Sequence, residues 1–201
     1  MLVFNFCQKF CPEKLDFELS NRLGEGADGE VFELKGIADK VIKFSVLYES
    51  SDEDNKYDQI CRTLDFLKIH KPDSYARVYE HKMLGKYTPP FIGSNQVQKR
   101  TLYYYVMEKL LKISEDEKRV FHSILSHEDK NLNKNYSINK IKKMLTGMSM
   151  GLDFDEKKVI LFVESLKTSK VCHNDLHNRN IMKDFNGNFK LIDFDRSYLL
   201  G

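Results

Sequence analysis

The stretch VCHNDLHNRNIMKDFNGNFKLIDFDRS crowds acidic, amide and imidazole side chains around short apolar runs. Asp175 and Asn180 are five residues apart, and Asp193 follows Asp175 by eighteen. Asn186-Gly187 between apolar runs is typical of a β-hairpin turn, so Asp193 is expected at the end of the second hairpin strand. A carboxylate can activate a hydroxyl within hydrogen-bond reach, and Asn and Asp oxygens suit Mg²⁺ that keeps phosphate and water in its other positions. The stretch therefore predicts a metal-nucleotide site.

A glycine cluster in the first half of the chain is the second sequence feature that points to a nucleotide site. LGEGADGEV carries Gly24, Gly26 and Gly29 in a G-x-G-x-x-G pattern, followed by Val31. The alternation of polar and apolar residues on both sides predicts a strand, a turn and a strand. A dinucleotide-binding fold would need a helix after the glycines, but EVFELKG is strand-like. The motif favours a hairpin whose backbone N–H groups approach phosphates, with an ordinary glycine-rich turn as an equal alternative.

Lys43 lies fourteen residues after Gly29, in a second β run, DKVIKFSVL. Alternate side chains of a strand share a face, so Lys43 is expected on the same side as Val41 and Ser45. Taken alone, this pattern favours a lysine that points to solvent, with a lysine facing an anion as the alternative.

The remaining segments predict a mostly β first half and a mostly helical second half. Apolar residues recur at three- and four-residue steps from Asp52 to His70, which predicts an amphipathic helix. YARVYEHKML and TLYYYVMEKL are expected to be strands, joined by a turn in GKYTPPFIGSN. Helices are expected in SEDEKRVFHSILSHE, INKIKKMLTGM and DFDEKKVILFVESLKT, the last capped by Asp153 or Asp155.

Composition excludes several classes of protein. The 201 residues suit one domain or two small lobes, with 41% hydrophobic and 31% charged residues. A net charge of +2 gives no case for a nucleic-acid or membrane partner. The chain has no apolar run long enough to span a bilayer and no signal-peptide pattern at its start, and its four cysteines are too few and scattered for a disulfide framework. We therefore expect a cytoplasmic protein.

In their order, these motifs resemble those of the protein-kinase-like superfamily, which includes protein kinases and their small-molecule relatives. LGEGADGEV resembles the glycine-rich loop, VIK the strand-three lysine motif, and YYYVMEKL the last small-lobe strand with the hinge. HNDLHNRN resembles the catalytic loop H-x-D-x-x-x-x-N, and LIDFD the metal-binding D-F-G region. The resemblance covers about residues 17–197. It implies an α+β bilobal fold, with a β-rich N-lobe over 1–108 and a truncated, mostly helical C-lobe over 109–201.

The resemblance also implies ATP and Mg²⁺ as cofactors and assigns the catalytic and metal-binding roles. Asp175 would be the catalytic base or hydroxyl-orienting group, and His173 would brace the catalytic loop. Asn180 and Asp193 would bind Mg²⁺. Lys43 would hold the α- and β-phosphates of the nucleotide.

The nucleotide-binding roles follow in the same way. Gly24, Gly26 and Gly29 would cover the phosphates. Met107 would lie at the back of the adenine pocket, and backbone groups of Glu108 and Leu110 would hydrogen-bond the base. The side chains expected to pack on the adenine ring are Val31, Met182 and Ile192.

The sequence departs from the family pattern at several positions. The acidic partner of Lys43 is open between Glu53, on the apolar face of the helix, and Asp58, at a more family-like distance. His177 stands where protein kinases usually carry a lysine, as in aminoglycoside and choline kinases and in atypical protein kinases. Asp195 replaces the glycine of D-F-G, as in bacterial sugar and lipopolysaccharide-core kinases. Its carboxylate is expected to pair with Arg179 or Arg196, or else to lie near the metal.

The resemblance implies a minimal kinase, similar to phage- or virus-type serine/threonine kinases. The chain ends six residues after Asp195, so no activation-loop control is expected, and a viral kinase would work in the host cytoplasm. The expected reaction moves the γ-phosphoryl group of ATP to a hydroxyl, first of all a protein Ser or Thr. Alternatives are a small-molecule hydroxyl, or a nucleotide-binding pseudokinase scaffold, and a homo-oligomer could supply missing surface in trans.

Overall fold

The computed structural model describes residues 17–26, 29–49, 56–87, 99–126 and 137–200. These residues form a mixed α+β structure with a five-stranded antiparallel sheet and four α-helices. The chain divides into two compact units, Met1–Lys68 with Arg77–Lys109, and Ile69–Ala76 with Leu110–Gly201. None of the described helices has the length and apolar character needed to cross a membrane.

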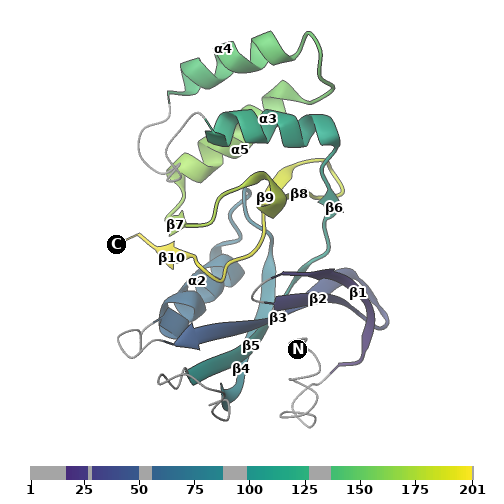
Figure 1. Ribbon diagram of the computed structural model, residues 1–201, viewed down its shortest axis with the longest axis vertical. Coiled ribbons are helices and arrows are strands. Elements are labelled where there is room, and N and C mark those ends of the chain that lie inside the picture. The colour runs from purple at the N-terminus through teal and green to yellow at the C-terminus, as the bar shows by residue number, and fades with distance from the viewer. Residues whose placement is uncertain (1–16, 27–28, 50–55, 88–98, 127–136, 201) are drawn as a thin grey trace, which may run out of the picture. The chain divides into compact units, whose positions relative to one another are not determined.

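The first unit is built on the five-stranded sheet, in the order β1-β2-β3-β5-β4 (Figure 1). Its elements are β1 (Leu19–Glu25), β2 (Gly29–Leu34), β3 (Ile37–Glu49), α2 (Lys56–His70), β4 (Val78–Tyr87) and β5 (Lys99–Glu108). The strands and the helix predicted for this part of the chain are therefore confirmed, although the expected helix start at Asp52 and most of the predicted turn in GKYTPPFIGSN lie outside the described residues.

Both faces of the central strands are covered. On one face, buried Phe32, Phe44 and Tyr104 form the centre of an apolar core. The other face packs against α2, where the Tyr57 ring meets the Tyr103 ring edge-on at 5.4 Å. A strand that is buried on both faces does not need the alternation of a half-exposed strand. This explains why the run of tyrosines in β5 is fully buried.

The described part of the second unit contains three α-helices and several short strands (Figure 1). Its elements are β6 (Leu111–Lys112), α3 (Glu115–Ser126), α4 (Ile138–Met148), α5 (Glu156–Thr168), β7 (Val171–Cys172), the 3₁₀ turn η2 (Asn178–Asn180), β8 (Ile181–Lys183), β9 (Phe189–Leu191) and β10 (Tyr198–Leu199). Strands β6, β8 and β9 form one small sheet, and β7 pairs with β10 in another.

Local sequence signals explain where α3 and α5 begin. Before α3, the backbone N–H of Ser114 donates to Glu117 Oε2 (2.7 Å), and the Glu117 N–H donates to Ser114 Oγ (3.2 Å). This reciprocal pair is a capping box. At α5, the Asp155 carboxylate accepts from the Lys158 N–H (3.1 Å), so Asp155, of the two predicted candidates, is the N-cap.

The predicted β8–β9 hairpin is confirmed and is held by its turn and by aromatic packing. The Asp184 carboxylate accepts from the backbone N–H groups of Asn186 (2.9 Å) and Asn188 (2.8 Å), and Gly187 takes the left-handed conformation (φ 77°). The Phe189 ring packs edge-on against Phe121 of α3 at 4.8 Å. The hairpin is thereby fixed to the helices of its own unit.

The segment Ile69–Ala76 joins the second unit through backbone hydrogen bonds to β9. The Leu191 N–H donates to Ser74 O (2.8 Å), and the Ala76 N–H donates to Leu191 O (2.8 Å). Tyr75 adds a bond from its hydroxyl to Val171 O (2.9 Å). The expected linear division at residues 108 and 109 did not include this segment, because no local motif marks it.

Candidate active site

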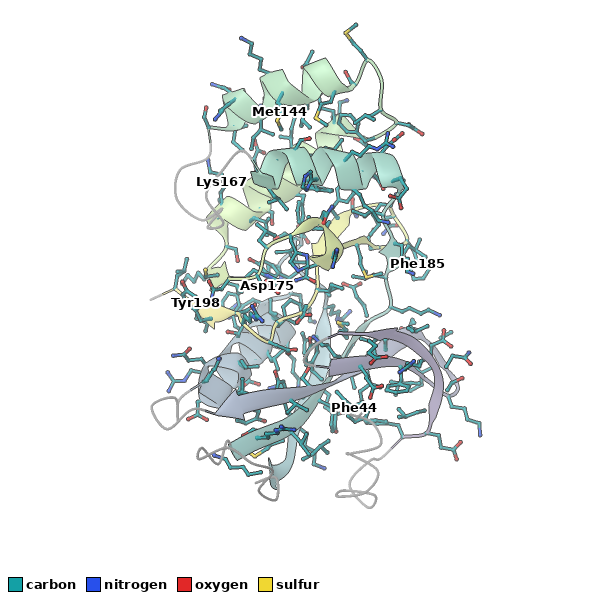
Figure 2. All side chains as sticks on the ribbon, viewed as in Figure 1. Phe44, Met144, Lys167, Asp175, Phe185 and Tyr198 are labelled. Atoms are coloured by element: carbon teal, nitrogen blue, oxygen red, sulfur yellow. The ribbon has the colours of Figure 1, made fainter. Side chains whose placement is uncertain are left out.

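The residues predicted to carry the chemistry lie on two backbone segments of the second unit. His173, Asp175 and Asn180 come from the loop and 3₁₀ turn between β7 and β8, and Asp193 follows β9. Figure 2 shows Asp175 on this loop. Because β9 pairs with β8, the hairpin returns the chain from Asn180 to the neighbourhood of the same loop.

Asn180 connects the two segments. Its side-chain Nδ2 donates to the backbone oxygen of Asp175 (3.0 Å) and makes a longer contact with Asp175 Oδ2 (3.4 Å). The Ile192 N–H donates to the backbone oxygen of Asn180 (2.9 Å). The structure therefore brings Asp175 and Asn180 into contact and ties Asn180 to the residue that precedes Asp193.

His173 is buried and supports the same backbone. Its Nε2 lies 2.7 Å from the backbone oxygen of Ile192, and its own carbonyl accepts from Ser197 Oγ (3.2 Å). Burial lowers the pKa of the imidazole, against the opposing effects of the bond to Ile192 and of the carboxylates of Asp193 and Asp175. The neutral ring donates through Nε2, which fits a bracing role rather than contact with substrate.

Two non-glycine residues at the site have left-handed backbone conformations. Asp193 has φ 67° and Asn174, in the loop after β7, has φ 54°. Such conformations are uncommon for residues with a side chain, and they tend to occur at active sites, where the surroundings hold them. The backbone on both sides of the site is therefore set by its packing and hydrogen bonds.

Two basic side chains stand beside the Asp175 carboxylate. His177 Nε2 lies 3.7 Å from Asp175 Oδ2, and Arg196 Nη1 lies 4.0 Å from Asp175 Oδ1. His177 is fixed from its other side, because its Nδ1 accepts from the Arg179 N–H (3.2 Å). Asp195 is buried, whereas its candidate partner Arg196 is exposed and lies beside Asp175.

The oxygen atoms at this site suit a hard cation such as Mg²⁺, which takes only some of its ligands from the protein. Among the described residues there is no group of three or more His, Cys, Asp or Glu side chains that could enclose a metal ion. Asn180 and Asp193 offer oxygen ligands, and the Asn180 Nδ2 is already bonded to Asp175, which leaves Oδ1 as its acceptor. Two oxygen ligands with room for phosphate and water are what Mg²⁺ accepts, so these residues fit the ion.

In the first unit, Gly29 and Lys43 pack together. Gly29 pairs with Ser45 across β2 and β3, and a Cβ atom at Gly29 would collide with the backbone oxygen of Phe44 and lie 3.1 Å from Lys43 Cε. Lys43 is only 6% exposed. The pattern-based expectation that it points to solvent is wrong, because its face of the sheet carries Tyr105, whose ring centre is 5.9 Å from Lys43 Nζ, and packs against α2.

Gly24 and Gly26 differ from Gly29. Among the described residues, a Cβ atom at Gly24 would meet nothing within 4 Å, and one at Gly26 would make only an ordinary contact with Gly29 O at 3.9 Å. Neither has a left-handed conformation, and both are exposed. Internal packing therefore explains Gly29 but not the other two glycines. The tip of the loop, at residues 27–28, lies outside the described residues.

The residues expected around adenine divide between the two units. Met107 is buried and Val31 half-buried in the first unit, and Leu110, Met182 and Ile192 are half-buried in the second.

Backbone pairing narrows the role expected for Glu108. The Glu108 N–H donates to Arg77 O (3.0 Å), so of its two backbone groups only the carbonyl remains a candidate for recognising adenine. Of the two candidate partners of Lys43, Glu53 lies outside the described residues, and Asp58 is exposed in the first turn of α2.

Arg196 is the site residue that the sequence reasoning missed, since it was considered only as a partner of Asp195. Its place beside Asp175 depends on a turn at Phe194–Ser197, and no periodicity or motif in the sequence signals that contact. The chain matches no protein-family model and no curated protein sequence. The interpretation of the site therefore depends on its geometry and its motifs.

Proposed function

We propose that this chain is an ATP- and Mg²⁺-dependent phosphotransferase with a bilobal protein-kinase-like fold and a reduced C-lobe. Its acceptor is a hydroxyl, in the first place a Ser or Thr side chain of a protein. The observation that carries the proposal is the Asn180 amide, which bonds to Asp175 while its backbone is tied to Ile192, next to Asp193. A base and two oxygen ligands are thereby held on adjoining segments.

The chemistry assigned to the second unit follows from these groups. Asp175, with a partly exposed carboxylate, orients the acceptor hydroxyl and takes up its proton. Asn180 and Asp193 hold Mg²⁺, which when bound neutralises charge on the phosphates. His173 keeps the backbone before Asp193 in place through its bond to Ile192.

The first unit supplies the groups expected to bind the phosphates. Lys43 is buried on a central strand, and a lysine ammonium in such a place can form a strong, charge-assisted hydrogen bond with a nucleotide phosphate. Contacts with the described residues do not explain why Gly24 and Gly26 are glycine, which supports close approach of phosphate oxygens to their backbone N–H groups.

The direct test is phosphoryl transfer by the purified full chain with γ-labelled ATP and Mg²⁺. We expect label on the chain itself or on an added mixture of proteins, and loss of transfer in Asp175→Ala and Asp193→Ala. Asp153→Ala, which removes an exposed acid before α5, is the matched control and should keep transfer. Transfer that is equal in all four proteins would refute the proposal.

A small-molecule acceptor is the second candidate, and the observation that favours it is His177. This residue takes the place of a lysine usual in protein kinases, and its Nε2 is 3.7 Å from Asp175. Labelled ATP added to a whole lysate, followed by separation into protein and small-molecule fractions, distinguishes the two acceptors. Thermal stabilisation by nucleotide without any transfer would instead identify a pseudokinase.

A further inference from the structure

Arg196 is an exposed residue held in a tight, buried turn. The Ser197 N–H donates to Phe194 O (3.0 Å), which closes the turn over Asp195 and Arg196. Phe194, Asp195 and Ser197 are buried, whereas the Arg196 side chain is 57% exposed. The turn therefore presents one cationic side chain from a fixed backbone.

The backbone on both sides of this turn is tied to the start of the catalytic loop. Ser197 Oγ donates to the backbone oxygen of His173 (3.2 Å), and Tyr198 of β10 pairs with Cys172 of β7. Asp175 and Tyr198 lie on these adjoining segments in Figure 2. The position of Arg196 relative to Asp175 is thus set by the fold of the second unit.

The two oxygens of the Asp175 carboxylate have different surroundings. Oδ2 lies near Asn180 Nδ2 (3.4 Å) and His177 Nε2 (3.7 Å). Oδ1 lies 4.0 Å from Arg196 Nη1. Since Oδ2 is directed to the Asn180 side, Oδ1 is the oxygen better placed to receive the proton of an acceptor hydroxyl. A hydroxyl bound there would lie close to the Arg196 guanidinium.

The ion pair between Arg196 and Asp175 adds little to stability. An exposed ion pair with a separation of 4.0 Å is too long for a hydrogen bond and contributes little to folding. A guanidinium can, however, bind the carboxylate of another molecule in a bidentate manner, with two parallel N–H···O hydrogen bonds.

We propose that Arg196 forms an anion-binding subsite next to the catalytic base and selects protein acceptors with an Asp or Glu close to the target Ser or Thr. The inference rests on the proposed phosphotransferase function and names its substrate class. Arg196 acts here as a specificity-determining residue. The acceptor hydroxyl meets Asp175 Oδ1, and the neighbouring carboxylate of the acceptor meets the guanidinium.

The test compares two peptides that share one Ser and differ only in their flanking residues, Glu in one and Lys in the other. Rates of label transfer, as kcat/KM, are measured with the full chain and with Arg196→Lys, Arg196→Gln and Arg196→Glu. The control is Lys157→Glu, an equal charge reversal at an exposed position in the first turn of α5, at the opposite end of that helix from β7 and the catalytic loop.

The original chain and the Lys157→Glu variant should both prefer the Glu peptide. Arg196→Gln should lower the ratio of the two rates by about fivefold, the effect of losing one exposed charge pair. Arg196→Glu should favour the Lys peptide, and Arg196→Lys should keep most of the original preference. A merely structural role would lower both rates together and leave their ratio unchanged.

The outcomes separate this inference from the function on which it rests. If the original chain transfers phosphate but shows no preference, or if Arg196→Gln and Arg196→Glu keep its preference, the subsite is wrong and the phosphotransferase stands. If the original chain transfers phosphate to no peptide, protein or small molecule, both proposals fail. Thermal melting of each variant shows whether it is folded, and the preference of the original chain for the Glu peptide, which the inference requires, gives a result even if Arg196→Gln and Arg196→Glu unfold.

Discussion

Replacing Gly29 and Gly24 by alanine separates two reasons for glycine within one motif. At Gly29 the added Cβ would collide with the Phe44 carbonyl, and it would lie 3.1 Å from both Lys43 Cε and Ser45 Oγ. The nearest obstacle is backbone, so no side-chain rotation can relieve it, and β2 would have to move away from β3. At Gly24 the same atom would meet nothing within 4 Å.

The expected magnitudes follow from this difference. Overpacking of this kind costs about 1–3 kcal/mol, and in a chain of this size each kcal/mol lowers Tm by about 2–4 °C. Gly29→Ala should therefore melt about 2–12 °C below the original chain. Gly24→Ala should melt within about 2 °C of it, because its backbone is not left-handed and its site is open.

For nucleotide binding, in contrast to stability, we expect Gly24 to be the sensitive position. If its backbone approaches a phosphate, the added methyl group should raise the KM for ATP although the protein is as stable as before. The assay is thermal melting of both variants, followed by measurement of the KM for ATP in label transfer at a temperature where both are folded. A large drop in Tm for Gly24→Ala, or none for Gly29→Ala, would refute the packing argument, and an unchanged KM in Gly24→Ala would refute the phosphate argument.

Two further predictions concern the second unit. Asp155→Ala removes the N-cap of α5 and should lower the free energy of unfolding by about 1 kcal/mol, which lowers Tm by about 2–4 °C. Asp153→Ala, the control, should change Tm by less than about 2 °C. Equal changes in Tm for the two variants would contradict the assignment of Asp155 as the cap. Burial lowers the pKa of His173, so the unfolded chain takes up the proton first, and stability should fall as the pH drops below the ordinary histidine value near 6.5. Urea midpoints at pH 7.5 and 5.5 should differ less in His173→Gln than in the original chain; an equal difference in the two proteins would refute this.

Local signals in the sequence predicted the elements of the fold well. Hydrophobic periodicity located α2, and Ser114 with the acidic residues after it marked the start of α3. The Asn-Gly pair located the β8–β9 hairpin. In each case the information lies within a few residues of the feature, which is why sequence alone was sufficient.

The prediction for Lys43 failed because it depended on more distant parts of the chain. The strand pattern of β3 assumes that one face is in water. In this structure the same face carries Tyr103 and Tyr105, which strand pairing of β5 with β3 brings there. It also packs against α2, where Tyr57 contacts Tyr103. All of these residues lie more than ten positions from Lys43 in the sequence. The pairing of Ile69–Ala76 with β9 is also nonlocal, and no motif accompanies it.

The candidate site combines both kinds of information. The spacing of Asp175, Asn180 and Asp193 is visible in the sequence. The structure adds the hydrogen bonds and strand pairs that hold the site residues in place. Asn180 and His173 bond to backbone atoms within the second unit, and Gly29 and Lys43 are fixed by strand pairing within the first.

Each group of residues is thus set by the folding of its own unit. Under the proposed function, changes around Gly24 and Gly26 then act on the affinity for ATP, and changes at Asp175 act on the transfer step. A variant whose only defect is in acceptor choice requires a residue that touches the acceptor alone, and under the proposed subsite Arg196, 4.0 Å from Asp175 Oδ1, is such a residue.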